Sequence, residues 1–303
     1  NANAFSTGNA ISFTSINVYN TSSLTTTGAG SMTGNLYMLN TATFSGNNIS
    51  GSILTTGKDS AGTSFSSTVF TASQAITGFP TVNVQAGSFS TNGFAMSNVN
   101  TAFNIASGCT ATFDAIVAGT GALNVNGTLN NSVANGIGLS GIVTIAGTLN
   151  VLQNLSLNNS VNSSGTIAVS SGKTFTVNGG LYIYNNAVIS GSVVGGVASS
   201  LVVGQDSSAT NYAATNATIS ATLTNVRTIN VLHGSLTTSG VITGVDTAFN
   251  IANGASANFG AAVTGAVAAA NAGSLIAYDT MTFDSYASTG TTTFVVTNAA
   301  KVG

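Results

Sequence analysis

The 303-residue chain carries few side chains that could do chemistry. Its six acidic residues are all aspartate, and it has four lysines or arginines, one histidine and one cysteine. A Ser-His-Asp triad would have to use His233, but no Gly-x-Ser-x-Gly turn surrounds that residue. We therefore interpret His233 as a half-buried or surface polar residue on a strand. The sequence predicts no catalytic, cofactor-binding or metal-ligating residues.

The carboxylates are scattered along the chain, at Asp59, Asp114, Asp206, Asp246, Asp279 and Asp284. General acid–base pairs need two converging carboxylates, and calcium loops need several at close spacing. Only Asp279 and Asp284 are near each other, and neither belongs to an Asp-x-Asp loop. Asp59 and Asp206 both stand in a Gly-x-Asp-Ser sequence, which predicts an Asx-turn at each. A calcium ligand or an inter-subunit contact is the alternative for these two.

The remaining candidates also have structural interpretations. A single cysteine excludes an internal disulfide framework, so Cys109 is predicted to be a small buried residue, with an intermolecular disulfide or a reactive thiol as the alternative. Gly28-Ala-Gly30 lacks the spacing and the lysine of a phosphate loop and is interpreted as a turn. Six tyrosines could line a sugar-binding strip, although a structural stack is favoured: Tyr37, Tyr182, Tyr184, Tyr212, Tyr278 and Tyr286.

Charge is almost absent from this chain, with a net charge of -2 at pH 7. Such a surface cannot form the basic face that nucleic acid requires, nor a polybasic membrane anchor. With 43% hydrophobic residues the chain is not expected to be disordered. The lack of Glu, Lys and Arg also argues against a mostly helical protein.

Two segments bear on targeting and on helix content. The chain opens Asn1-Ala2-Asn3 without a basic or apolar leader pattern, so we expect a mature or trimmed chain. The most apolar stretch, residues 261–277, is interrupted and too short to span a membrane. Its Ala-rich part, residues 261–272, is the one candidate for a helix.

Elsewhere, apolar and polar residues alternate in short runs, as in Leu123-Asn-Val125, Val143-Thr-Ile145 and Phe175-Thr-Val177. This period of two indicates half-buried strands. Clusters of Gly, Asn and Ser, such as Asn158-Asn-Ser160, separate the runs and supply turns. The sequence therefore predicts an all-β protein.

An internal duplication organises the chain. Residues 81–119 align with residues 228–265, and with one gap 20 of 38 aligned pairs are identical. The match continues upstream at an offset of 145 to 147, so that Gly57-Lys-Asp59 aligns with Gly204-Gln-Asp206. The chain is thus predicted to consist of two halves, residues 1–150 and 151–303. No charged or Pro-rich linker separates them, so we expect the two halves to be continuous as one solenoid. A shorter echo links Leu123-Asn-Val125 to Leu149-Asn-Val151 at an offset of 26, which predicts a coil of about that length.

Two architectures accommodate these patterns. One is a parallel β-solenoid, or β-helix, and the other is a pair of β-sandwich domains. Small and β-branched residues suit the thin core of a solenoid, and Asn, Ser and Thr can stack in register as side-chain ladders. A sandwich usually needs more large aromatic residues, and this chain has no Trp. The solenoid is the favoured prediction.

Segments such as Gly121-Ala-Leu-Asn-Val-Asn-Gly-Thr-Leu-Asn130 resemble the passenger repeats of bacterial autotransporters and related surface-layer or adhesin β-helix proteins. The resemblance implies extracellular or cell-surface display, adhesion or assembly, without catalysis. We therefore expect a structural protein that assembles with copies of itself into a filament, tube or surface layer. The alternative is an adhesin or fibre-shaft module that binds cell-surface glycans. A carbohydrate-active enzyme is disfavoured by the scattered aspartates.

Overall fold

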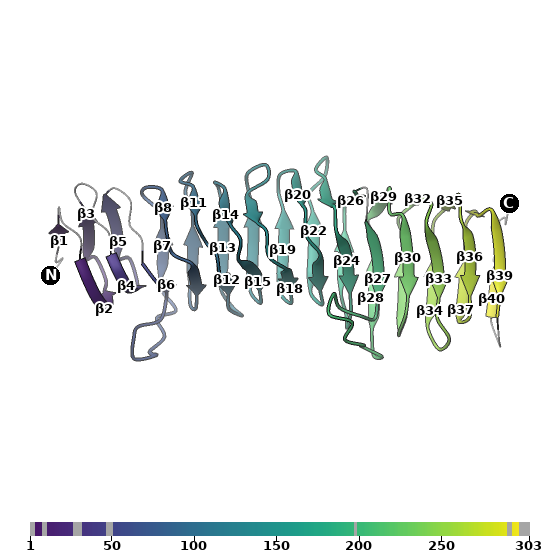
Figure 1. The fold of residues 1–303 in the computed structure, drawn as a ribbon, viewed down its shortest axis with the longest axis horizontal. Helices are drawn as coiled ribbons and strands as arrows, with labels where there is room; N and C mark the ends of the chain where they lie inside the picture. The colour runs from purple at the N-terminus through teal and green to yellow at the C-terminus, as the bar shows by residue number, and fades with distance from the viewer. Residues whose placement is uncertain are drawn as a thin grey trace. The chain divides into compact units, whose positions relative to one another are not determined.

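The computed structural model describes residues 4–7, 11–26, 32–46, 51–196, 199–289 and 293–296. These residues form short strands and turns, and the named strands pair in parallel throughout. The fold is therefore the predicted β-solenoid, because two β-sandwiches would consist of antiparallel sheets. The chain divides into two compact units, residues 1–155 and 156–303, which together hold about 13 turns (Figure 1).

In the first unit, successive coils contribute strands to three sheets. The first sheet contains β2 (Ile11–Val18), β4 (Met32–Met38), β6 (Ile53–Thr56), β9 (Thr81–Val84), β12 (Ala102–Ile105), β15 (Ala122–Val125) and β18 (Val143–Ile145). The second contains β7 (Val69–Thr71), β10 (Ser88–Ser90), β13 (Thr110–Phe113), β16 (Thr128–Asn131) and β19 (Thr148–Val151), and the third contains β8 (Ile76–Thr77), β11 (Met96–Ser97), β14 (Val117–Gly119) and β17 (Ile137–Leu139). A separate three-stranded sheet is formed by β1 (Ala4–Thr7), β3 (Ser23–Thr26) and β5 (Thr43–Gly46).

The second unit repeats the three-sheet arrangement. The first sheet contains β21 (Val161–Ser163), β24 (Gly180–Ile183), β27 (Ser200–Val203), β30 (Thr228–Val231), β33 (Ala248–Ile251), β36 (Ala268–Asn271) and β39 (Ser285–Ser288). The second contains β22 (Thr166–Val169), β25 (Val188–Ser190), β28 (Asn216–Ile219), β31 (Ser235–Thr238), β34 (Ser256–Phe259), β37 (Ser274–Ala277) and β40 (Thr293–Val296). The third contains β20 (Leu155–Leu157), β23 (Phe175–Val177), β26 (Ser192–Gly195), β29 (Thr222–Thr224), β32 (Ile242–Val245), β35 (Val263–Gly265) and β38 (Met281–Thr282).

The duplicated segments have the same local structure in both units. β12 and β33 both read Ala-Phe-Asn-Ile and bury the second and fourth residues. β13 and β34, which follow them, also bury alternate positions and end in a buried phenylalanine. The internal repeat read from the sequence is therefore confirmed at the level of strands and the faces they bury.

The helix predicted for residues 261–272 is wrong, because this segment forms β35 and β36. Val263 donates a backbone hydrogen bond to Thr280 O, and Ala269 is in register with both Phe249 and Tyr286. Ala269 is 1% exposed, so its small side chain packs inside the coil. Intrinsic helix propensity is a weak term, and strand neighbours on both sides outweigh it. No helix of the described ranges is long and apolar enough to cross a membrane.

The predicted coil length of about 26 residues is also wrong. In the middle of the first unit, paired residues on neighbouring coils are 20 positions apart in the sequence, which is the length of one coil there. Leu123 pairs with Val143, whereas Leu149 pairs with Leu129 in a different sheet. The offset of 26 residues thus related β15 to β19. These two strands are separated by one full coil and one further corner. The error arose because strands on different sides of a coil share the same short apolar-polar pattern.

The core of each unit is made from inward-facing alternate residues. In the first unit Phe103 is fully buried and packs edge-on against Phe89 and Phe113, with ring centroids 5.4 and 5.0 Å apart. In the second unit Phe249 has the equivalent place and contacts Phe259, with ring centroids 5.6 Å apart. Burial of these rings stabilises the stack by about 2–3 kcal/mol per side chain.

Asparagine ladders run along the outer faces, as the composition predicted. Asn104 Nδ2 donates to Asn83 Oδ1 at 2.8 Å, and Asn124 Nδ2 donates to Asn104 Oδ1 at the same distance. The second unit has a comparable pair, in which Asn250 Nδ2 donates to Asn230 Oδ1 at 2.7 Å. Each side-chain amide forms a hydrogen bond with the amide on the neighbouring coil, which requires the strands to be in register.

The ladder predicts a graded response to alanine substitution. Asn104 has two amide partners and Asn124 has one, so Asn104→Ala should lower the free energy of unfolding by about 1–3 kcal/mol and Asn124→Ala by about half as much. Urea denaturation of the two variants would measure this difference. Equal losses would contradict an energetic role for the ladder.

Candidate functional site

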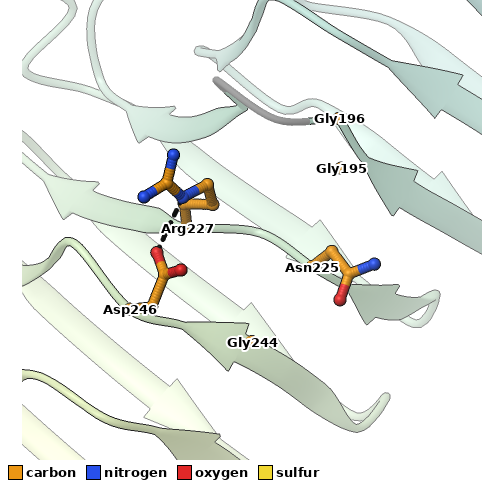
Figure 2. Close-up of a pocket in the computed structure, with 6 residues that line it drawn as sticks. All are labelled: Gly195, Gly196, Asn225, Arg227, Gly244 and Asp246. Atoms are coloured by element: carbon orange, nitrogen blue, oxygen red, sulfur yellow. Dashed lines mark hydrogen bonds and ion pairs between the residues drawn. The ribbon is translucent and has the colours of Figure 1, made fainter.

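The most pronounced charged feature of the second unit is a shallow groove of about 330 Å³, lined by Gly195, Gly196, Asn225, Arg227, Gly244 and Asp246. Figure 2 shows Arg227 and Asp246 facing each other on neighbouring coils, while the side chain of Asn225 points away from them. Arg227 lies between β29 and β30, and Asp246 follows β32. The groove therefore occupies a corner between the third and first sheets.

An ion pair lines this groove. Arg227 Nε donates to Asp246 Oδ1 at 2.8 Å, and Thr247 Oγ1 donates to the same oxygen at 2.9 Å. These two hydrogen bonds hold the pKa of Asp246 below its usual range. Both charged side chains remain about half exposed, at 41% and 50%. Solvent screens such a pair, so its net contribution to stability is small.

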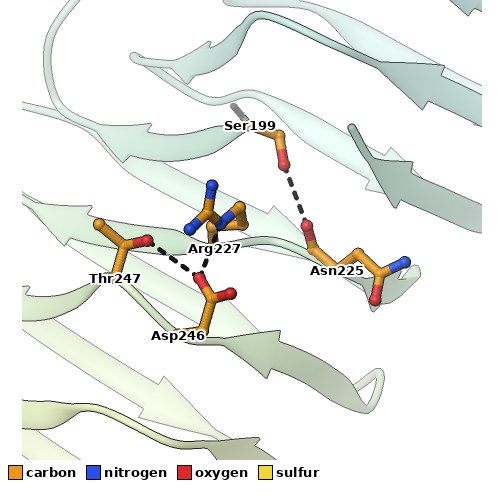
Figure 3. Close-up of polar contacts among 5 residues, drawn as sticks. All are labelled: Ser199, Asn225, Arg227, Asp246 and Thr247. Atoms are coloured by element: carbon orange, nitrogen blue, oxygen red, sulfur yellow. Dashed lines mark hydrogen bonds and ion pairs between the residues drawn. The ribbon is translucent and has the colours of Figure 1, made fainter. Parts of the chain in front are cut away.

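A side chain of the preceding coil also holds the backbone beside the ion pair. Ser199 Oγ donates to the carbonyl oxygen of Asn225 at 3.0 Å, as Figure 3 shows together with the ion pair. Asn225 has a positive φ of 57°, a conformation that asparagine tolerates better than most residues. The corner is thus fixed by the neighbouring coil.

The charged pair that lines this groove is specific to the second unit. In the duplicated segment of the first unit, the positions of Arg227 and Asp246 are occupied by Pro80 and Asn100, which carry no charge. The lining residues offer hydrogen bonds to a polar ligand, but they include only one carboxylate and no nucleophile. This arrangement can bind polar groups and lacks a general acid–base pair.

A second candidate feature is repeated in both units, as the loops that contain Asp59 and Asp206. Each loop leaves the first sheet after β6 or β27 and extends beyond the strands (Figure 1). Asp59 Oδ1 accepts from the N–H groups of Ala61 and Thr63 at 3.0 and 2.8 Å. Asp206 Oδ1 accepts in the same way from Ser208 and Thr210, at 2.9 Å each. The predicted Asx-turns are therefore present in both loops.

Each loop folds back over the outer face of its sheet. Ser60 exchanges two hydrogen bonds with the side chain of Asn17 on β2, at 2.8 and 3.0 Å. Ser207 exchanges the same two bonds with Asn162 on β21, at 2.8 and 2.9 Å. Between these anchors the loop crosses two strands, because Asn17 is in register with Tyr37 and Tyr37 with Thr55.

This crossing explains an exception to the alternation of burial. Thr55 on β6 and Val202 on β27 occupy outward positions, yet each is only 6% exposed. The loops also begin at equivalent glycines, Gly57 and Gly204, with φ of 81° and 85°. A Cβ at Gly57 would collide with the backbone carbonyl of Ala86, and one at Gly204 with that of His233. The close approach of the next coil therefore requires glycine at both positions.

In each Asp loop a tyrosine hydroxyl donates a hydrogen bond to the aspartate, but the two tyrosines do not occupy equivalent positions in the sequence. Tyr19 donates to Asp59 Oδ2 at 3.2 Å, and Tyr212 donates to Asp206 Oδ2 at 3.1 Å. Burial and the Asp hydrogen bond raise the pKa of both tyrosines. The ring of Tyr212 stacks on Tyr184 with centroids 4.2 Å apart. The aromatic stack therefore uses Tyr184 and Tyr212.

The surroundings lower the pKa of the aspartate carboxyl group in both loops. The N–H of Thr63 is the main cause that lowers the pKa of Asp59. Burial tends to raise the pKa of Asp206, but the N–H groups of Thr210 and Ser208 and the Tyr212 hydroxyl outweigh it, so the net shift is downward. Both loops therefore favour the ionised carboxylate.

The remaining candidate residues are dispersed. Asp114 accepts from Ser90 Oγ at 2.9 Å, and Asp279 accepts from the N–H of Thr280 at 2.6 Å. His233 is half-buried, but it lies in the turn between β30 and β31 and not on a strand as predicted. Within the described ranges, no three His, Cys, Asp or Glu side chains are grouped so as to hold a metal ion.

Cys109 is a buried thiol, whereas two other candidates lie at the surface. Cys109 is 2% exposed, and burial raises the pKa of its thiol, in agreement with the predicted small buried residue. Asp284 and Tyr278 are exposed at the surface. The Gly28-Ala-Gly30 turn lies outside the described residues.

Sequence reasoning missed the groove and the loop anchors. The duplication offset of 145 relates Asn17 to Asn162, so comparison of the two halves could have identified both anchors. Arg227 and Asp246 are 19 residues apart and carried no motif, and their meeting depends on the stacking of coils. Comparison of the chain with family models, curated proteins and solved structures finds no match.

One position of the Asp loops is glycine in the first unit and alanine in the second. Exchanging the two residue types there should have opposite effects on stability. Gly62 and Ala209 both have positive φ, of 90° and 64°. Alanine pays roughly 1–2 kcal/mol for this conformation, while glycine gains about 0.4–1 kcal/mol of entropy on unfolding. Ala209→Gly should therefore stabilise the protein by roughly 0.5–1 kcal/mol, and Gly62→Ala should destabilise it by a similar amount. Thermal unfolding would measure both, and shifts of the same sign would contradict this account.

Acidification should loosen both loops. Because folding lowers the pKa of Asp59 and Asp206, their contribution to stability is present above the unfolded value of about 3.9 and is lost as pH falls through the lowered folded values. Hydrogen exchange at Thr63 and Thr210, corrected for intrinsic rates, should accelerate in that range. Asp206→Asn should remove the pH dependence at Thr210 and leave that at Thr63. Loss at both residues would contradict independent loops.

Proposed function

We propose that this chain is a non-catalytic extracellular structural protein that assembles with copies of itself into a filament, tube or surface layer. The supporting observation is the position of β40 and β2. Each is the outermost described strand of its sheet and has one neighbouring strand there. A strand edge of this kind is a template for pairing with another chain.

Regular register between β37 and β40 favours such pairing at that edge. Parallel neighbours match residue for residue, as in Ser274↔Thr293 and Ile276↔Val295 between β37 and β40. A strand from a second copy could continue the same backbone ladder.

The surface chemistry supports close contact between copies. Charged residues make up 3% of the chain, so neighbouring copies would experience little repulsion. The Asn, Ser and Thr side chains on outer faces provide hydrogen bonds to a partner surface. The low charge and the resemblance to bacterial surface β-helix proteins also motivate the proposed extracellular location.

A lysine at the edge should weaken assembly. Val295 is 38% exposed on β40, and lysine on an edge strand disfavours further strand pairing. Val295→Lys should raise the concentration at which half the protein is polymerised by about tenfold, equivalent to about 1.4 kcal/mol per contact. Analytical ultracentrifugation and negative-stain electron microscopy of the purified chain would measure this.

Thr237→Lys provides the matched control for this experiment. Thr237 is exposed on β31 and lies in the same register column as Val295, through Asn258 and Ile276. Its substitution adds the same charge away from the edge and should leave polymerisation unchanged. Equal effects of the two lysines would contradict assembly through β40. Strictly monomeric behaviour of the parent chain at high concentration would contradict the proposal and favour an adhesin or fibre-shaft module, which a glycan array would test.

A further inference from the structure

Five Asn-Gly pairs occur in the chain, at Asn92-Gly93, Asn126-Gly127, Asn135-Gly136, Asn178-Gly179 and Asn253-Gly254. Asparagine followed by glycine is prone to attack by the glycine nitrogen on the side-chain amide, because glycine has no side chain to hinder the approach. In a folded protein the attack also needs a mobile asparagine side chain and an available glycine N–H. The five pairs share the same sequence chemistry and differ in how the fold restrains them.

Hydrogen bonds to the asparagine side chain restrain two of the pairs. Asn92 Nδ2 donates to Ala72 O at 3.1 Å, and Asn178 Nδ2 donates to Asn158 Oδ1 at 2.7 Å. The amide that would have to rotate toward the glycine nitrogen is therefore held by the neighbouring coil.

Hydrogen bonds from the glycine nitrogen restrain two more. The Gly127 N–H donates to Ile105 O, and the Gly136 N–H donates to Val133 O, both at 3.2 Å. In these pairs the attacking nitrogen is already engaged with a backbone carbonyl.

Asn253-Gly254 lacks both kinds of restraint within the described chain. The pair lies in an exposed turn between β33 and β34, which is closed by the Ala255 N–H donating to Ala252 O at 3.0 Å. A Cβ placed on Gly254 would meet no described atom within 4 Å. A hollow of about 270 Å³ adjoins the turn and is lined by backbone and small residues, including Ser256 and Gly273. The turn therefore has both room to move and access to water.

We propose that Asn253 is a site of spontaneous covalent modification, with water as the only co-reactant. The Gly254 backbone nitrogen bonds to Asn253 Cγ, and the side-chain nitrogen leaves as ammonia together with the proton lost from the Gly254 nitrogen. Water then opens the resulting succinimide at one of its two carbonyls. The products are aspartate and isoaspartate at position 253, and no oxidation or reduction takes place.

The modification changes a chain with very little charge. Each event adds one carboxylate to a protein whose net charge is -2. The isoaspartate product also lengthens the backbone by one carbon in the turn that leads into β34. Both changes occur on the exposed surface of the second unit.

Peptide mapping by mass spectrometry tests the proposal on the intact folded chain at mildly alkaline pH. Asn253 should be modified at least about tenfold faster than each of the other four pairs, because each of those must first break a hydrogen bond. In denaturant all five rates should converge. A folded-state rate at Asn253 no faster than at the other pairs, or the same ratio in denaturant, would overturn the proposal.

A gain-of-site variant gives a second test. Ser107-Gly108 occupies the equivalent turn of the first unit, which is closed by the Cys109 N–H donating to Ala106 O at 3.1 Å. Both residues are exposed, and Gly108 also has open space around it. Ser107→Asn should create a second site that reacts within about threefold of Asn253, whereas Asn253→Ser should abolish the original one. A slow reaction at position 107 in a folded variant would overturn the claim that this turn causes the reactivity.

Discussion

In-register parallel stacking of short strands is the interaction on which the rest of this structure depends. Each residue of a strand has the corresponding residues of two neighbouring coils about 4.8 Å away. Most inward positions are therefore apolar, as in the column Val82, Phe103, Leu123 and Val143, which is fully buried. A change of register by one residue would turn this column to solvent.

The same stacking explains why the chain has so little charge. On an outer face, a residue type that recurs in successive coils meets its own kind at the inter-strand spacing. Amides satisfy one another there, as Asn83, Asn104 and Asn124 do, whereas like charges in the same places would repel. The exposed ion pair of Arg227 and Asp246 follows this rule, since opposite charges occupy neighbouring coils. Low charge is thus a physical consequence of the architecture.

The candidate functional features are the places where the chain departs from the regular coil. The Asp59 and Asp206 loops interrupt the coil and cover part of an outer sheet face, and their anchoring asparagines recur in both units. The charged pair of Arg227 and Asp246 and the Asn-Gly sequence at Asn253 occur in the second unit, whereas the equivalent positions of the first unit hold uncharged residues and Ser107-Gly108. Divergence after the duplication has therefore altered corners and turns, where a substitution does not disturb the stacked core.

The sequence by itself determined the all-β class, the duplication and the Asx-turns, because these depend on alternation and local turn chemistry. It favoured the parallel solenoid over two β-sandwich domains, and the parallel strand pairing decided between them. It did not determine the coil length, since the short patterns of β15 and β19 are interchangeable until strands pair. Nor could it assign residues 261–272, where alanine's helix propensity yielded to backbone pairing with β33 and β39. The burial of Thr55 and Val202 and the meeting of Arg227 with Asp246 were likewise decided by tertiary structure. The local alternation of apolar and polar residues specifies whether a side chain faces inward or outward. Which side chains lie beside it on that face is decided only when the coils stack.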